Sequence, residues 1–315
     1  MITVENVSKT YGKHVAVKDL NFTVDKGEIV GFLGPNGAGK TTTMNIITGY
    51  ISATEGRVTV AGSDVLESPE QVKSRIGYLP EFPPLYLDMT VNDYLNFACD
   101  LKKVPRTKRK QSLDEITDRV KIGDVRKRLM KNLSKGYRQR VGMAQALVGN
   151  PEVLILDEPT IGLDPKQVID IRTTITDLGK EHTIILSSHI LPEVSAVCER
   201  VLIINRGEIV ADDTADNLSQ ELIGGTGLVL RIAGPEQQAV QTIKKVPGAK
   251  DVAVLETREP DTVELRVEAD KNTDIRRDVF SAMSEAGLPI LVMRPHDITL
   301  EEIFLQLTTR EKGEA

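Results

Sequence analysis

The sequence predicts an α/β fold followed by a small α+β domain. Two continuous apolar runs, Val153–Leu156 and Thr183–Leu186, are typical of parallel strands buried on both faces of a sheet. A third apolar run, Glu28–Leu33, leads into a glycine-rich loop and then into a segment of helical character. This strand–loop–helix order is typical of α/β folds. After about residue 222 the order of expected strands and helices changes, which predicts a second domain.

The length of 315 residues agrees with two domains, since a domain averages roughly 150 residues. We place the first domain at residues 1–222 and the second at residues 228–315. Residues 66–150 are expected to be mostly helical, and residues 201–210 to form a hairpin. The chain before the glycine-rich loop is expected to form three short strands: Ile2–Val4, Val15–Val24 and Glu28–Leu33.

The second domain shows the order strand, helix, strand, strand, helix, strand between residues 228 and 295, which predicts a ferredoxin-like unit. A glycine-rich linker, Gly224–Gly227, is expected to precede it. A last helix is expected from Thr299, with Glu302 completing a capping box. The expected strands are Leu228–Ile232, Val252–Leu255, Val263–Val267 and Ile290–Met293.

Composition and charge exclude several classes of protein. Apolar residues make up 40% of the chain and charged residues 27%, which is ordinary for a globular protein. The net charge of -6 argues against a nucleic-acid partner, because sequence-independent binding needs a basic surface. No apolar stretch approaches the roughly 18 residues of a membrane span, and the N-terminus lacks the pattern of a secretory signal. We therefore expect a cytoplasmic protein whose Cys99 and Cys198 are buried apolar groups.

The glycine-rich loop matches the phosphate-binding pattern G-x-x-x-x-G-K-[ST] in its expected position between a strand and a helix. Its backbone N–H groups and the helix N-terminus favour phosphate oxygens. Lys40 is expected to contact the β- and γ-phosphates, and the Thr41 hydroxyl to bind Mg²⁺. The predicted nucleotide-binding residues here are Gly34, Pro35, Asn36, Gly37, Ala38, Gly39, Lys40, Thr41 and Thr42.

Two carboxylates follow the apolar run Val153–Leu156. Asp157 ends the predicted strand, at the sheet edge where ligands bind in α/β folds, and is expected to hold Mg²⁺ through water. Glu158 follows directly and is expected to act as the general base that activates the attacking water.

Further segments resemble those of ABC transporter ATPases. Leu133–Arg140, LSKGYRQR, is similar to the signature usually written LSGGQ, with Ser134 as a predicted helix N-cap. It departs from that consensus at Lys135 and Tyr137. Gly162–Pro165, which includes Asp164, is similar to the D-loop, and His189 matches the switch histidine. Tyr11 matches the aromatic residue that stacks on adenine.

The resemblance covers residues 1 to about 220. It implies an ATP- and Mg²⁺-dependent ATPase with a mixed sheet, an antiparallel β subdomain and a helical subdomain at about residues 82–150. It also implies a dimer, expected to be a homodimer, with ATP between the phosphate loop of one copy and the signature of the other. Ser134 would then act across the interface. Gly136 and Asp164 would also belong to the nucleotide-binding residues, and Lys40, Glu158 and His189 would carry catalysis.

One segment is similar to a particular group within this family, the exporter ATPases. Glu81 stands where most of the family has glutamine, and it is expected to approach Mg²⁺ through its carboxylate. The run from Pro80 to Val91 is similar to exporter ATPases of the gliding-motility and drug or polysaccharide type. In that group a separate polytopic permease would dock on residues 82–100. The chain would thus lie on the inner face of the cell membrane.

Several alternatives stay open in the sequence. A non-transport ABC ATPase or a kinase or GTPase could share the phosphate loop, although the latter would not explain Asp164 or His189. The basic residues between Lys102 and Lys110 are either a solvated helix face or attracted to anionic lipid heads. The second domain could regulate, stabilise a dimer or contact the permease. The other histidines are expected to be surface or structural: His14, His182 and His296.

Overall fold

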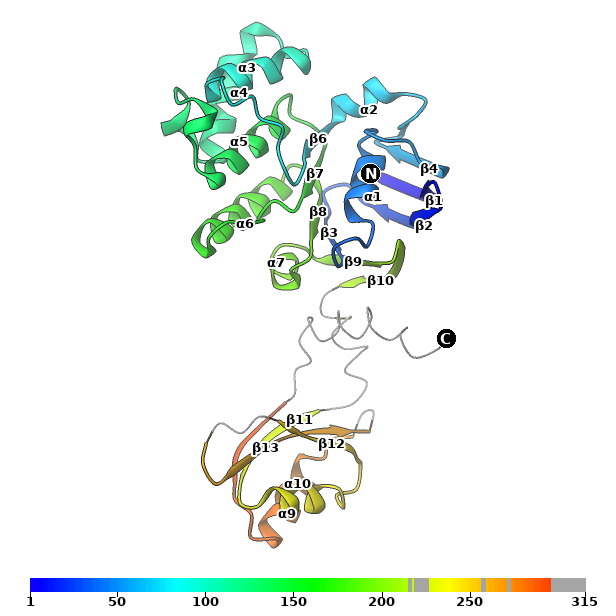
Figure 1. The fold of residues 1–315 in the computed structure, drawn as a ribbon, viewed down its shortest axis with the longest axis vertical. Coiled ribbons are helices and arrows are strands. Elements are labelled where there is room, and N and C mark those ends of the chain that lie inside the picture. The colour runs from blue at the N-terminus through cyan, green and yellow to red at the C-terminus, as the bar shows by residue number, and fades with distance from the viewer. Residues whose placement is uncertain (215–216, 218–226, 256–258, 271–272, 296–315) are drawn as a thin grey trace. The chain divides into compact units, whose positions relative to one another are not determined.

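The computed structural model describes residues 1–214, 217, 227–255, 259–270 and 273–295 (Figure 1). The chain divides into two compact units, Met1–Ala215 and Asp216–Ala315. The domain boundary expected between residues 222 and 228 falls largely outside the described residues and stays a prediction. The same holds for the linker and for the helix expected from Thr299.

The first unit contains a four-stranded antiparallel sheet in the order β2-β1-β4-β5. The alternating apolar residues of the predicted second strand, Val17, Leu20, Phe22 and Val24, are buried, which confirms that strand. The two last strands of this sheet were not among the expected strands. Its members are β1 (Ile2–Tyr11), β2 (His14–Val24), β4 (Glu55–Val60) and β5 (Ser63–Asp64).

A six-stranded mixed sheet in the order β10-β9-β3-β8-β7-β6 forms the centre of this unit. Every residue of β7 and β8 is buried, as the continuous apolar runs predicted. Only the hairpin strand β10 is antiparallel to its neighbour. The strands are β3 (Ile29–Leu33), β6 (Ile76–Leu79), β7 (Val153–Asp157), β8 (Thr183–Ser188), β9 (Arg200–Asn205) and β10 (Glu208–Thr214).

The mostly helical segment of residues 66–150 also contains one strand that was not expected, β6. This strand pairs in parallel with β7, from Ile76 opposite Val153 to Leu79 opposite Leu156. It has only four residues, and its partner lies far along the chain. Its local sequence therefore carries little of the information that makes it a strand.

Helices cover both sides of the central sheet. In Figure 1, α5 and α6 lie on one side, and α1 lies on the other side with the antiparallel sheet. Residues 82–150 hold α3, α4 and α5. The helices of this unit are α1 (Lys40–Ile47), α2 (Pro69–Arg75), α3 (Val91–Leu101), α4 (Arg106–Arg119), α5 (Lys135–Leu147), α6 (Pro165–Gly179) and α7 (Leu191–Ser195), with short 3₁₀ turns at Gly123–Val125 and Met130–Asn132.

The main core lies between the two sheets and around α1. Phe22 of β2 and Phe32 of β3 meet there with ring centroids 5.8 Å apart. Met44 and Ile47 of α1 are fully buried in the same cluster. The burial of apolar surface on both sides of β3 fixes the end of this strand, where the glycine-rich loop begins.

The second unit is a four-stranded antiparallel sheet in the order β12-β13-β11-β14. Together with its two helices this is the ferredoxin-like arrangement that the sequence predicts. Ile243 and Val279, one from each helix, pack on the inner side of the sheet. Its elements are β11 (Leu228–Ala233), α9 (Glu236–Ile243), β12 (Ala249–Leu255), β13 (Thr262–Ala269), α10 (Arg276–Glu285) and β14 (Ile290–Pro295).

Two other expectations can be compared with the structure. Cys99 and Cys198 are buried, which confirms their interpretation as apolar groups. Within the described part of the chain, no helix combines the length and the apolar character needed to cross a bilayer.

Candidate functional site

The glycine-rich loop between β3 and α1 is the centre of the candidate site. Gly39 has a φ of 109° directly before α1, and a Cβ atom there would lie 2.7 Å from the carbonyl oxygen of Ala16. A Cβ atom on Gly34 would lie 2.5 Å from the carbonyl oxygen of Ile204. Both positions therefore need glycine. The loop can thus pass close to the sheet and place α1 with its N-terminus toward an anion.

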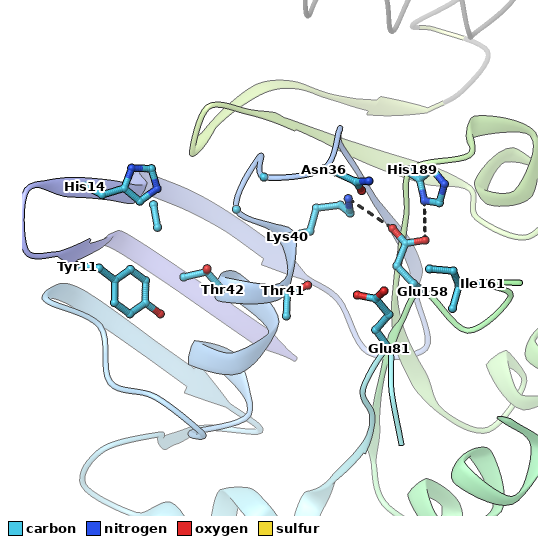
Figure 2. Close-up of a pocket in the computed structure, with 13 residues that line it drawn as sticks. Tyr11, His14, Asn36, Lys40, Thr41, Thr42, Glu81, Glu158, Ile161 and His189 are labelled. Carbon is cyan, nitrogen blue, oxygen red and sulfur yellow. Dashed lines mark hydrogen bonds and ion pairs between the residues drawn. The ribbon is translucent and has the colours of Figure 1, made fainter. Parts of the chain in front are cut away.

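A pocket of about 560 Å³ lies beside this loop (Figure 2). It brings together residues that the sequence placed in separate motifs. Gly34, Pro35 and Ala38 belong to the loop without lining the pocket. The predicted site residues that line it are Tyr11, Asn36, Gly37, Gly39, Lys40, Thr41, Thr42, Glu81, Glu158 and His189.

The carboxylate of Glu158 lies between the side chains of Lys40 and His189 (Figure 2). Nζ of Lys40 is 3.4 Å from Oε1, and Nδ1 of His189 is 2.9 Å from Oε2. Lys40 and Glu158 are both buried, and Lys40 also donates to the carbonyl oxygen of Gly34 at 2.8 Å. Burial of a charge is costly unless it is paired, so these contacts hold Glu158 in place.

The backbone of Glu158 is strained. Its φ of 48° lies in the left-handed region, which costs a residue with a Cβ atom about 1–2 kcal/mol. Ser187 at the end of β8 compensates, because its Oγ and its carbonyl oxygen accept hydrogen bonds from the Glu158 N–H at 3.0 and 3.2 Å. The turn moves the Glu158 side chain out of the strand direction and into the pocket.

The residues around Asp157 fit a Mg²⁺ ion. Asp157 is fully buried, and Ser187 donates to its Oδ1, while Oδ2 has no hydrogen-bond partner among the described residues. An orphaned buried carboxylate oxygen is expensive unless a ligand satisfies it. Asp157, Thr41 and Glu81 line one adjoining cavity of about 520 Å³. These oxygen donors suit Mg²⁺ held partly through water.

Tyr78 in the same cavity is a neutral donor. Burial, with a smaller contribution from Asp157, raises the pKa of the Tyr78 phenol above its ordinary value. The hydroxyl therefore stays protonated and donates to Oδ1 of Asn45 at 3.2 Å.

Ser134, Gly136 and Asp164 lie together but do not line the pocket of their own chain. Ser134 caps α5, with its Oγ accepting from the Tyr137 N–H at 3.3 Å, and this confirms the predicted N-cap. Asp164 caps α6 by accepting from the Gln167 N–H at 2.9 Å. A Cβ atom on Gly136 would lie 2.4 Å from Oε1 of Gln167, so the two helix starts are adjacent.

The two departures from the signature consensus have contacts within the chain. The Tyr137 hydroxyl donates to Oδ2 of Asp124 at 3.0 Å. Lys135 lies against the D-loop, since a Cβ atom on Gly162 would be 2.0 Å from its Nζ. Both side chains therefore fix the signature segment to neighbouring parts of the same unit.

Sequence reasoning missed some residues of the pocket. His14, Ala16 and Ile161 also line it, and only the folding of β2 over the loop brings the first two there. His182 is structural as expected, because it is buried and its Nδ1 is 2.7 Å from the carbonyl oxygen of Pro151. His296 lies outside the described residues.

The chain is similar to several known proteins. The sequence family described as "ABC transporter" matches residues 17–161. The linearmycin resistance ATP-binding protein LnrL of Bacillus subtilis (strain 168) is 31% identical over 311 residues, covering 98% of this chain and 99% of the relative. The chain belongs to the ABC transporter family of ATP-binding subunits.

Other similar proteins lie in the same family. The daunorubicin resistance ATP-binding protein DrrA3 of Streptomyces coeruleorubidus is 31% identical over 312 residues, covering 98% of this chain and 95% of the relative. The ATP-binding cassette MJ0796, a dimer in a post-hydrolysis state bound to ADP and Pi, is similar with a TM-score of 0.63 and 25% identity. That match covers 68% of this chain and 98% of the cassette.

This ABC transporter subunit is therefore an ATP-binding ATPase, as the resemblance implied. The alternative of a kinase or GTPase is wrong. The comparisons also favour a transport subunit over the non-transport members of the family.

Proposed function

We propose that this subunit is the motor of an exporter at the inner face of the cell membrane, with Glu158 as the general base of ATP hydrolysis. The observation that carries the assignment of the base is its position between Lys40 and His189 in the pocket. A carboxylate there can accept the proton of a water molecule that attacks the γ-phosphate.

In this proposal Lys40 exchanges its ion pair with Glu158 for a contact with phosphate. In the structure its ammonium group neutralises Glu158 and donates to the loop backbone. When a triphosphate enters, its oxygens compete for the same ammonium group. Lys40 then stabilises phosphate charge, and Glu158 is left as a free base oriented by His189. Mg²⁺, held by Thr41, Asp157 and Glu81, would neutralise charge on the phosphates. Tyr11, a residue that is 48% exposed and lines the pocket, is placed to stack on adenine.

The dimer completes the site. Ser134, Gly136 and Asp164 lie at adjacent helix starts outside the pocket of their own chain. Helix N-termini favour anions, so a second copy that faces the pocket would add donors to the γ-phosphate. We propose that closure of two copies over ATP is therefore required for hydrolysis.

An exposed aromatic cluster supports the permease contact on residues 82–100. Tyr86 contacts Phe97 and Tyr94 with ring centroids 5.6 and 6.2 Å apart. Phe82 is 71% exposed and Tyr86 57% exposed. Exposed apolar patches of this kind mark interaction sites. The relatives named for linearmycin and daunorubicin resistance favour an exporter of an antibiotic-like compound.

Affinity purification of the tagged chain from detergent-solubilised membranes tests this proposal. We expect a polytopic membrane protein to co-purify, and the variant Phe82→Ser with Tyr86→Ser to lose it. Phe280→Ser in the second unit is the matched control, because that aromatic ring is 63% exposed and lies outside the cluster. Recovery without any membrane protein, or equal recovery with all variants, would contradict the docking proposal.

A further inference from the structure

A second polar cavity lies in the helical part of the first unit, away from the nucleotide pocket. It has a volume of about 460 Å³ and is formed by α3, by the start of α4 and by the loop that contains Arg126. Four of its residues are cationic and two are amides. The residues that line it are Asn92, Asn96, Arg106, Arg109, Lys110, Leu113 and Arg126.

Two of the four cations already have carboxylate partners. Arg109 pairs with Asp100 at 2.7 Å, and Arg126 pairs with Asp114. Arg126 also donates to Oδ1 of Asn92 at 3.3 Å, so this guanidinium is fixed toward the cavity wall.

The other two cations are left with positive charge at the cavity. Within the described part of the chain, neither Arg106 nor Lys110 lies within ion-pair distance of a carboxylate. The cavity therefore carries a net positive charge.

The start of α4 adds to this positive charge, and both Arg106 and Lys110 are exposed. The helix begins with the sequence RTKRK at Arg106 and has no acidic residue in its first turn. A helix N-terminus carries partial positive charge, so cations there are destabilising and anions are stabilising. A bound anion would offset both the helix dipole and the side-chain charges.

We propose that this cavity binds a phosphate group. Arginine guanidinium groups match phosphate with paired hydrogen bonds, and the Asn92 amide on the same wall carries an N–H₂ group that can donate. The volume exceeds what a single phosphate group needs. The group can thus be part of a larger molecule, either a soluble phosphate compound or the headgroup of an anionic phospholipid.

The placement of the cavity favours the lipid, and this part of the inference rests on the proposed function. Helix α3 carries Asn92 and Asn96 of the cavity as well as Tyr94 and Phe97 of the aromatic cluster. If the aromatic cluster docks a permease, the same helix lies close to the membrane surface. Anionic headgroups attract basic residues there.

Two double variants with the same change of charge test the proposal. The cavity variant is Arg106→Gln with Lys110→Gln, and the control is Lys108→Gln with Lys127→Gln, whose residues are exposed and do not line the cavity. Glutamine keeps the helix propensity of lysine and arginine, so folding is preserved. The full chain is tested by flotation with phosphatidylcholine vesicles, with and without phosphatidic acid. It is also tested by titration with inorganic phosphate in a Lys40→Ala background.

We expect the cavity variant to bind its ligand at least about tenfold more weakly than the control, since each charge-assisted hydrogen bond contributes about that factor. If the cavity variant loses binding to vesicles with phosphatidic acid, the site is assigned to the lipid headgroup. Loss of phosphate binding in solution, with no vesicle binding by the parent chain, assigns it to a soluble compound. Equal loss in both double variants, or no binding of either ligand by the parent chain, overturns the proposal. Neither assay needs the permease, so failure of the docking experiment would leave the phosphate assignment standing.

Discussion

Nζ of Lys40 lies 3.4 Å from Oε1 of Glu158, and both side chains are about 7% exposed. The cation of the phosphate loop and the proposed base thus form one buried ion pair. Each compensates the charge of the other in the absence of phosphate. The account predicts that nucleotide enters by exchanging this pair for a pair of Lys40 with phosphate, which leaves Glu158 ready to accept a proton.

Replacement of Lys40 by alanine should weaken ATP binding by about 10- to 100-fold, because a charge-assisted hydrogen bond to phosphate is lost. Titration with a fluorescent ATP analogue measures this. Lys18→Ala is the control, since Lys18 forms an exposed pair with Glu208 at 2.6 Å. Equal affinity of the Lys40 variant and the parent would exclude Lys40 from the phosphate site.

Replacement of His189 by alanine should slow hydrolysis by about 10- to 100-fold with little change in ATP affinity, because the base loses the contact that orients it. Single-turnover hydrolysis separates these two effects. His14→Ala is the matched control, because His14 lines the same pocket without contacting Glu158. If the His14 variant hydrolyses ATP as slowly as the His189 variant, the positioning role of His189 is refuted.

The strands that follow from local patterns could be predicted from the sequence. Val153–Leu156 is apolar at every position and Ile184–Leu186 follows a single threonine, and a segment buried on both faces needs little more information than that. The four strands of the second unit were predicted for a similar reason. Their apolar residues concentrate between segments with turn and helix character, and the order of elements then determines the sheet.

Strands that depend on distant partners could not be predicted. β4 begins with Glu55 and Gly56, which have low β propensity, and it becomes a strand because β1 lies beside it. β6 contains Gly77 and depends on β7 in the same way. Both segments are short and contain a glycine, so their few β-forming residues do not identify a strand and the tertiary pairing decides the outcome.

The residues of the candidate site could also be predicted only in part from the sequence. The phosphate loop is a local motif, so its residues could be named from the sequence. The contact of Glu158 with Lys40 and His189 depends on β3, β7 and β8 lying side by side in the sheet. No local sequence pattern predicts this order of strands. His14 reaches the pocket only because β2 folds over the loop, and it was therefore not predicted as a site residue.

Gly77 of β6 should be intolerant of alanine. A Cβ atom there would lie 2.0 Å from the carbonyl oxygen of Ala146 in α5, so the helix and the strand would have to separate. Such overpacking costs about 3 kcal/mol, and we expect the melting temperature to fall by roughly 10 °C. Gly123→Ala is the control, since the nearest atom to its Cβ would be 3.7 Å away. Similar thermal melts for both variants would contradict the packing of α5 on β6.

Both cysteines should resist alkylation in the folded protein. Burial raises the pKa of the Cys99 thiol and of the Cys198 thiol above their ordinary value. Because the thiolate is the reactive form, a raised pKa leaves less of it at pH 8, and burial also blocks access. Iodoacetamide labelling followed by mass spectrometry should show no modification before denaturation and two modified cysteines after it. Labelling of either thiol in the native protein would contradict its burial.

ATP-dependent dimerisation of the Glu158→Gln variant tests the central claim most directly. Light scattering after gel filtration measures the mass, and hydrolysis is followed in parallel. The account predicts a stable dimer with ATP, hydrolysis slowed by at least about 100-fold, and a monomer when Ser134→Arg is added. Hydrolysis at the parent rate would contradict the role of Glu158, and a dimer that persists with Ser134→Arg would contradict the role of Ser134 across the interface.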